Sequence, residues 1–149
     1  MKISSSNNKF SNGPRKYVKR VLREMGLDKA FPEDRVYSVN DVLPACKPEP
    51  EAFQQIFDAI GVKDPSECVM VEDSMKNIRA AKKLGMATLL IAGIGKKSGK
   101  SMGNNMADAG EATKAGDAPD LKDPAVDVCI EHVREMKTAL PGLWETSNE

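Results

Sequence analysis

Aromatic residues and histidine are scarce in this sequence, and each shortage argues against a class of function. Aromatic side chains make up only 5% of the 149 residues, which leaves few surfaces on which nucleic-acid bases could stack. Nucleic acid is therefore not an expected partner. His132 is the only histidine, so neither a zinc enzyme of the usual kind nor a Ser-His-Asp hydrolase is expected.

Cysteines and long apolar runs are also few. Cys46, Cys68 and Cys129 lack the spacing of a metal site, and their odd number fits reduced thiols in an intracellular protein. No apolar run approaches the length needed to cross a membrane. We therefore expect a cytoplasmic protein without a membrane partner. The Ser-rich, acid-free start over residues 1–11 is also typical of an organellar transit peptide, but it runs directly into sequence with a structured pattern.

Acidic residues are absent from the first 23 positions, although acids and bases balance at 22 each over the whole chain. Seven Lys or Arg residues fall in that segment. A basic start can contact phosphate or nucleic acid. The interpretation that we favour is a solvated helix face.

Three segments carry the periodicity of amphipathic helices, and each ends at a glycine. Residues 15–25 and 51–60 place apolar side chains at i, i+1, i+4, i+5 and i+8, and residues 75–84 show a weaker stripe. A left-handed glycine followed by an apolar residue is a common helix end. The three predicted ends are Met25-Gly26-Leu27, Ile60-Gly61-Val62 and Leu84-Gly85-Met86.

Short apolar runs alternate with these helices, and we expect them to be strands. They cover residues 36–39, 68–71, 87–92 and 126–130. Helices alternating with short, nearly unbroken apolar strands are typical of a parallel sheet covered by helices on both faces. The sequence therefore predicts one α/β domain over residues 1–149.

The remaining segments are expected to be less regular. Residues 1–9 form an irregular start, and residues 93–124, which hold six of the eleven glycines, form a flexible insertion. Residues 126–145 are expected to contain the last strand, a final helix over 131–139 and a tail anchored by Trp144.

Two adjacent carboxylates, Glu72 and Asp73, end the apolar run 68–71. Acids at the end of a buried strand cost desolvation free energy unless a cation or hydrogen-bond donors meet them. In open α/β sheets, ligands bind at that end of the strands, and Mg²⁺ usually takes one or two carboxylates together with water and substrate phosphate. The pair is therefore a candidate magnesium site. The alternative is that Asp73 only caps the helix that follows, with Ser74 as a second possible cap.

Two further segments could contribute to the same chemistry. Lys47 lies between Cys46 and Pro48, just before a helix with an acidic first turn, and a lysine held near magnesium can neutralise phosphate charge. Ser11 and Asn12 precede the first helix, where a hydroxyl, a turn and a helix N-terminus can bind phosphate. Taken singly, Lys47 is better explained as an ordinary loop lysine, and Ser11 and Asn12 as a helix cap and turn.

The glycine-rich run after residue 92 is not a nucleotide-binding P-loop. That motif needs four residues between its first glycine and Gly-Lys-Ser. Counting back from Gly99, Gly93 leaves five residues and Gly95 leaves three. A nucleoside-triphosphatase is therefore not expected.

Taken in order, Ser11-Asn12, Lys47-Pro48 and Glu72-Asp73-Ser74 resemble the second, third and fourth motifs of the haloacid dehalogenase-like (HAD-like) hydrolases. The segments FSNGPRKYVKRVLREMGL, KPEPEAF, VEDSMKNIRAAKKLGM and LPGLWE are similar to its pyrimidine 5′-nucleotidase-like branch. The resemblance implies a partial Rossmann-like fold with three layers, and a phosphatase that uses Mg²⁺ and an aspartyl-phosphate to hydrolyse a phosphorylated small molecule, such as a nucleoside 5′-monophosphate.

The resemblance also implies roles for individual residues. Ser11 would hydrogen-bond the phosphoryl group with Asn12 beside it, and Lys47 would neutralise charge on the nucleophile and the phosphate. Asp73 and Glu72 would hold magnesium. Asn77 lies where some relatives carry a further acid.

The sequence departs from the family in its first motif, DxDxT, which supplies the nucleophilic aspartate and which these 149 residues do not contain. The cap that usually follows the motif is absent too. Because the family's first strand lies in the middle of the sheet, two strand edges would lack a partner. We therefore expect a truncated phosphohydrolase that is inactive alone. The alternative is a non-catalytic binding or regulatory module that associates with itself or a partner strand. A receiver domain is disfavoured because no early strand supplies an acceptor aspartate.

Overall fold

The computed structural model of the chain describes residues 7–93 and 118–141. The expectations about the first six residues, most of the glycine-rich insertion and the Trp144 tail lie outside these residues. The chain divides into two compact units, Met1–Lys63 and Asp64–Glu149. The single domain expected from the sequence stays a prediction, and each unit is described by itself.

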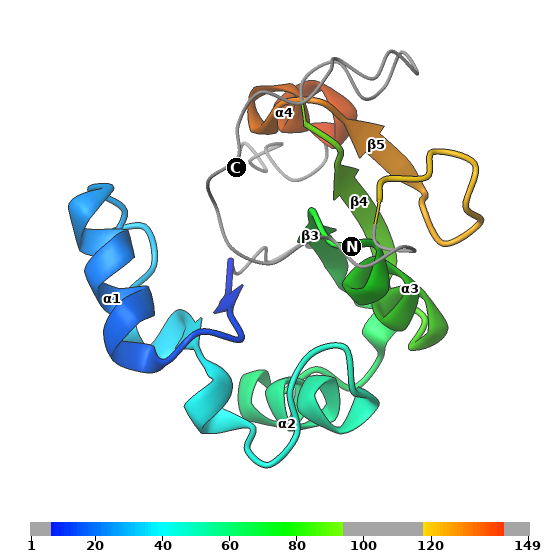
Figure 1. Cartoon of the computed structure of the whole chain (residues 1–149). Coiled ribbons are helices and arrows are strands. Elements are labelled where there is room, and N and C mark those ends of the chain that lie inside the picture. The colour runs from blue at the N-terminus through cyan, green and yellow to red at the C-terminus, as the bar shows by residue number, and fades with distance from the viewer. Residues whose placement is uncertain (1–6, 94–117, 142–149) are drawn as a thin grey trace, which may run out of the picture. The chain divides into compact units, whose positions relative to one another are not determined.

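The first unit combines two short parallel strands with two helices (Figure 1). In chain order the elements are β1 (Lys9–Phe10), α1 (Arg15–Glu24), β2 (Val36–Tyr37) and α2 (Pro50–Ile60). β1 and β2 pair in parallel, with Lys9 opposite Val36 and Phe10 opposite Tyr37. Residue 11 therefore lies directly after the carboxyl end of β1.

Two hydrophobic clusters stabilise the first unit. The buried face of α1 packs Val18 and Leu22 against Val36 of β2. The buried face of α2 contributes Ala52 and Ile56 to a second cluster, which Phe10 and other partly buried residues border. The stripe predicted for α2 is therefore largely buried. The stripe predicted for α1 is buried at Val18 and Leu22, whereas Tyr17 and Met25 at its two ends are each 64% exposed.

The second unit contains a three-stranded parallel sheet in the order β3-β4-β5 (Figure 1). Its elements are β3 (Val69–Glu72), α3 (Met75–Lys83), β4 (Ala87–Ile91), β5 (Val128–Ile130) and α4 (Met136–Ala139). Met75 and Ile78 of α3 pack against Leu90 of the central strand and Ala125. The α/β class with parallel strands is confirmed.

The three predicted helix ends are also confirmed. Gly26, Gly61 and Gly85 have φ angles of +68°, +74° and +92°, which are left-handed and favour glycine. After each glycine the amide of the next residue bonds back to the last turn, from Leu27 to Leu22, from Val62 to Phe57 and from Met86 to Ala81, at 2.8, 2.9 and 3.1 Å.

Several elements are shorter than the sequence predicted, including β4, which ends at Ile91, and β5, which begins at Val128. β2 ends at Tyr37 rather than at Val39, because Ser38 and Asp41 form a capping box that starts the 3₁₀ turn Val39–Asp41.

The final helix, expected over 131–139, begins instead as the 3₁₀ turn Val133–Glu135 and is α-helical only over Met136–Ala139. Its start is delayed by a second capping box, formed by His132 and Glu135. In the described part of the chain no helix combines the length and the apolar character that a membrane span requires.

Candidate functional site

Ser11 lies at the carboxyl end of β1, where the chain turns toward α1. Its amide donates to the Tyr37 carbonyl at 3.0 Å, which extends the parallel pairing by one residue. The hydroxyl oxygen accepts from the Gly13 amide at 3.1 Å, which leaves the hydroxyl hydrogen able to donate to another group. A Cβ at Gly13 would lie 3.3 Å from that oxygen, so a side chain at this position would crowd the Ser11 hydroxyl.

Lys47 is held beside Ser11 by its backbone and by its side chain. Its amide donates to Oδ1 of Asn12 at 3.0 Å, and its carbonyl accepts from Nδ2 of Asn12 at 2.8 Å. Its ammonium donates to the Phe10 carbonyl at 3.1 Å and lies 5.1 Å from the centre of the Phe10 ring. Although it carries a charge, Lys47 is only 7% exposed. The structure therefore brings together the three site residues predicted in this unit.

Phe10 is a contributor that sequence reasoning missed. Its ring meets Phe53 of α2 edge-on, with centroids 6.1 Å apart at 89°, and Phe53 is 3% exposed. The available signal was an apolar residue directly before Ser11 on a strand. Because the ring is anchored in the core, it offers the Lys47 ammonium a fixed electron-rich face.

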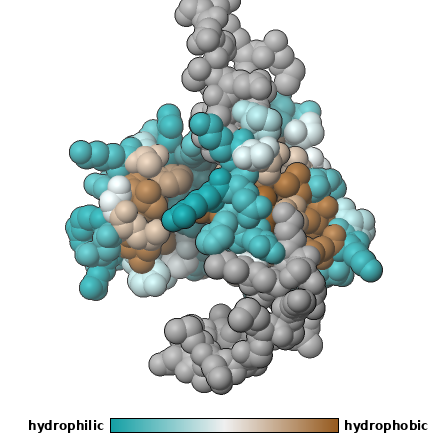
Figure 2. All heavy atoms as spheres, turned by 90° about the horizontal axis from the view of Figure 1, so that it is seen from above, coloured by the Kyte–Doolittle hydropathy of each residue, from teal (hydrophilic) through white to brown (hydrophobic). Residues whose placement is uncertain are grey.

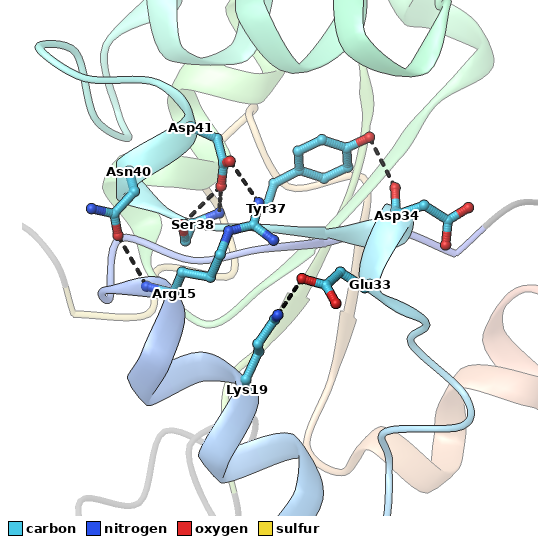
Figure 3. Close-up of polar contacts among 8 residues, drawn as sticks. All are labelled: Arg15, Lys19, Glu33, Asp34, Tyr37, Ser38, Asn40 and Asp41. Carbon is cyan, nitrogen blue, oxygen red and sulfur yellow. Dashed lines mark hydrogen bonds and ion pairs between the residues drawn. The ribbon is translucent and has the colours of Figure 1, made fainter.

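A polar network joins α1 to the segment after β2 (Figure 3). The Arg15 amide donates to Oδ1 of Asn40 at 3.0 Å, and the Arg15 guanidinium pairs with Asp41 at 2.6 Å. The other oxygen of Asp41 accepts from the amide and hydroxyl of Ser38 at 2.7 and 2.8 Å. Partial burial raises the pKa of Asp41, but Arg15 and Ser38 together outweigh it and leave that pKa below its ordinary value.

The basic face of α1 is partly neutralised within the unit. Lys19 pairs with Glu33 (Figure 3), and Lys19 lowers the pKa of this exposed carboxyl. These ion pairs support the interpretation of the basic segment as a solvated helix face.

Glu72 and Asp73 stand at the end of β3 in the second unit. Glu72 is half-buried and Asp73 is exposed. The Asp73 amide donates to Oε1 of Glu72 at 3.3 Å. The N-cap position of α3 is Ser74, and the alternative that Asp73 only caps this helix stays a prediction. Two consecutive residues with carboxylate side chains therefore stand at the carboxyl end of β3.

Asn77, in the first turn of α3, shows a feature that calls for a ligand or donor. The residue is 6% exposed, and its carboxamide oxygen is buried without a hydrogen-bond partner. A buried acceptor left unpaired costs about 1–3 kcal/mol.

Within residues 7–93 and 118–141, no group of three or more His, Cys, Asp or Glu side chains could hold a metal. Two carboxylates and an amide oxygen are nevertheless a donor set that suits Mg²⁺, which keeps several waters.

The structure thus holds Ser11, Asn12 and Lys47 together in one unit, and Glu72 and Asp73 together in the other. The union of the two groups in one site stays a prediction.

Comparison with known proteins identifies the family of the chain. A model of haloacid dehalogenase-like hydrolases matches residues 9–85, which are 77 of the 149 residues. The chain belongs to this family. All five predicted site residues fall within the matched range. The family assignment made from the three motifs is confirmed, and the comparisons assign no branch within it.

Named relatives support a phosphatase family. The chain is 32% identical over 81 residues to the putative phosphatase YhcW of Bacillus subtilis, a match that covers 54% of this chain and 35% of that protein. It is 36% identical over 78 residues to a phosphoglycolate phosphatase of Vibrio parahaemolyticus, which covers 52% of this chain and 32% of that protein.

A solved structure supports the fold. A haloacid dehalogenase-like protein of unknown function from Agrobacterium tumefaciens superposes with a TM-score of 0.66 at 20% identity, over 95% of this chain and 56% of that one. The chain spans about a third or less of the curated relatives, and about half of the solved ones.

Proposed function

We propose that this chain is part of a haloacid dehalogenase-like phosphohydrolase that acts on phosphate monoesters. The observation that carries the proposal is the cluster at the end of β1, where the Ser11 hydroxyl and the buried Lys47 ammonium lie on adjoining segments. A hydroxyl donor and a fixed cation suit the oxygens of a phosphoryl group.

The residues present take separate roles in this proposal. Ser11 donates a hydrogen bond to a phosphoryl oxygen. Lys47 neutralises the negative charge that two anions, the phosphate and a carboxylate nucleophile, bring to the site. Asn12 follows Ser11 directly after β1 and bonds to the Lys47 backbone, so it forms part of the same proposed phosphate-binding cluster.

Glu72 and Asp73 are the residues that would hold magnesium. The orphaned oxygen of Asn77, four residues beyond Asp73, supports a cation or a donor at this end of β3. A bound magnesium ion would neutralise charge on the phosphate during transfer.

The nucleophile is the part of the reaction for which these residues offer no candidate. The family's DxDxT motif is not among the 149 residues, and Glu24 is the first acid in the sequence. We therefore expect the 149-residue chain, assayed by itself, not to turn over phosphate monoesters. The resemblance to the pyrimidine 5′-nucleotidase-like branch makes a nucleoside 5′-monophosphate the first substrate to test.

The test is an assay of phosphate release from nucleoside 5′-monophosphates by the purified chain, with and without Mg²⁺. Release equal to that of a buffer control is expected. Magnesium-dependent release that Asp73→Asn abolishes would overturn the inactivity. Binding is measured separately: inorganic phosphate should shift the NMR signals of Ser11 and Lys47, and Lys47→Met should remove the shifts.

A second candidate function is a module that takes up a partner strand, and one observation favours it. In the described residues β3 pairs with β4 alone. The Cys68 carbonyl accepts from the Ala87 amide at 3.0 Å, so the backbone groups of Val69 and Val71 point to the other edge, because successive residues of a strand alternate. All four β3 residues are only half-buried, whereas Thr88, Leu89 and Leu90 of β4 are buried.

The partner proposed for this edge is a further strand, from a second copy or another protein. Figure 2 shows brown hydrophobic areas among teal hydrophilic ones on one face of the molecule. An open edge with apolar side chains is a template for pairing.

Val69→Pro tests the strand proposal, because it removes an edge amide at the first residue of β3, where proline is tolerated. Light scattering should show concentration-dependent association of the unsubstituted chain and its loss in the variant. A monomer with a sharp melt and no bound partner would exclude this function. That outcome would leave the phosphate-binding proposal standing.

A further inference from the structure

Asn12 differs from Ser11 in how its side chain is used. Both polar atoms of its carboxamide bond to the backbone of one residue, Lys47, which is 35 positions away. The Asn12 carboxamide therefore bonds to both backbone polar groups of Lys47, which lies in a turn outside any strand.

The contacts of Lys47 come from both neighbours of Ser11. Asn12 holds its backbone, while the Phe10 carbonyl and ring hold its ammonium. The side chain is long, and fixing it restricts several rotatable bonds, which costs conformational entropy. Bonds at both the backbone and the ammonium of Lys47 hold its charge in a fixed position.

We propose that Asn12 is a positioning residue, which sets the place of the Lys47 ammonium beside Ser11 rather than binding the substrate through its carboxamide. The proposal rests on the proposed function in one respect, namely that Lys47 meets phosphate. The chemical basis is that a carboxamide with both polar atoms engaged at 2.8 and 3.0 Å has its best-directed hydrogen bonds already in use.

The first readout is the hydrogen exchange of the Lys47 amide, measured by NMR on the full 149-residue chain. Asn12→Ala removes the acceptor, so the Lys47 amide should exchange about tenfold faster, the effect of losing one ordinary hydrogen bond. The matched control is Asn40→Ala, which removes an asparagine that accepts from the Arg15 amide at 3.0 Å (Figure 3). It should speed exchange at Arg15 and leave Lys47 unchanged.

The second readout follows the Lys47 ammonium, through competitive acetylation quantified by mass spectrometry. Lys47 should react several-fold faster in Asn12→Ala than in the unsubstituted chain, and Asn40→Ala should not change it. Equal reactivity of Lys47 in the two variants would overturn the positioning role. If Asn12→Ala does not fold, Asn12→Ser replaces it, because a hydroxyl can restore at most one of the two bonds.

The third readout is binding of inorganic phosphate, followed by NMR shifts of Ser11 and Lys47. The proposal expects weaker phosphate binding in Asn12→Ala together with faster exchange at Lys47. Weaker binding with an unchanged Lys47 amide would make Asn12 a direct ligand and overturn the proposal. Unchanged binding with a loosened Lys47 would overturn it as well. If the unsubstituted chain binds no phosphate, the proposed function fails, while amide exchange and acetylation still decide whether Asn12 holds Lys47.

Discussion

Thr88 offers a sharp test of what holds the second unit together. It lies on β4 and is 1% exposed. Its hydroxyl is 2.6 Å from the Ala125 carbonyl and 3.2 Å from Oδ2 of Asp127, and it accepts from the Asp127 amide at 3.1 Å. A hydroxyl has one hydrogen, so the shorter distance identifies Ala125 as its acceptor. Replacing Thr88 by valine removes these bonds and nearly preserves the volume.

The expected loss follows from the burial of the groups left behind. Ala125 is 7% exposed, so its carbonyl loses a partner in a place that water does not easily reach, which costs about 1–3 kcal/mol. The Asp127 amide belongs to an exposed residue and can turn to water at little cost. The added methyl group recovers at most about 0.8 kcal/mol. Thr88→Val should therefore destabilise the second unit by about 1–2 kcal/mol.

The assay is urea unfolding followed by NMR signals of β3, β4 and β5, because two compact units can unfold separately. The matched control is Thr138→Val at an exposed position of α4, which should change the free energy of unfolding by less than about 0.5 kcal/mol. If Thr88→Val and Thr138→Val have equal effects, the hydroxyl does not hold the segment before β5, and the reasoning is refuted.

Three further predictions follow from single contacts. The hydrogen bond from Lys82 holds the pKa of Asp127 below its ordinary value, so the unfolded chain takes up the proton first. The stability that this lowered pKa contributes is complete above about pH 4 and is lost as the pH falls through the lowered pKa. Lys82→Met should therefore make the loss of stability in acid shallower, measured by thermal melts between about pH 2 and 6. Gly85→Ala should cost about 1 kcal/mol in denaturant unfolding, because φ is +92° there and nothing lies near the added Cβ; no loss would mean that this helix end is not left-handed in solution. Phe53→Leu should destabilise the first unit by about 1 kcal/mol through the lost edge contact with Phe10, and a double-mutant cycle with Phe10→Leu that gives no coupling would contradict it.

The helices were predictable because their signals are local. The stripe that ends at Leu22 and the closing bond from the Leu27 amide involve residues within two turns of each other. The same holds for α2 and Gly61. Periodicity and a glycine end carry the information needed for such an element.

The strand lengths were less predictable because pairing partners lie far apart in the sequence. β1 has two residues and gains its identity from parallel pairing with β2, 27 positions later, where Lys9 faces Val36. β2 in turn stops where the side chains of Ser38 and Asp41 offer the backbone another set of bonds. Apolar runs set the candidates for strands, and side-chain caps decide where they end.

The candidate site was also predictable only in part. Residue types and their order indicated Ser11, Lys47 and Asp73, because charge and hydroxyl chemistry are visible in the sequence. The bond between Asn12 and the Lys47 backbone was not visible, since a carboxamide in a turn has many possible partners. Sequence therefore indicated the chemistry of the residues, and only the three-dimensional structure showed which of them hold the others.

We expect phosphate binding in the first unit and magnesium binding at Glu72 and Asp73 to respond separately to substitution. The bonds given above for Ser11, Asn12 and Lys47 are made by residues between Phe10 and Lys47. Asp73→Asn should therefore leave the exchange of the Lys47 amide and the binding of phosphate without Mg²⁺ unchanged, while weakening any enhancement of phosphate binding by Mg²⁺. Loss of metal-free phosphate binding in that variant would show that the cluster at the end of β1 does not by itself recognise phosphate.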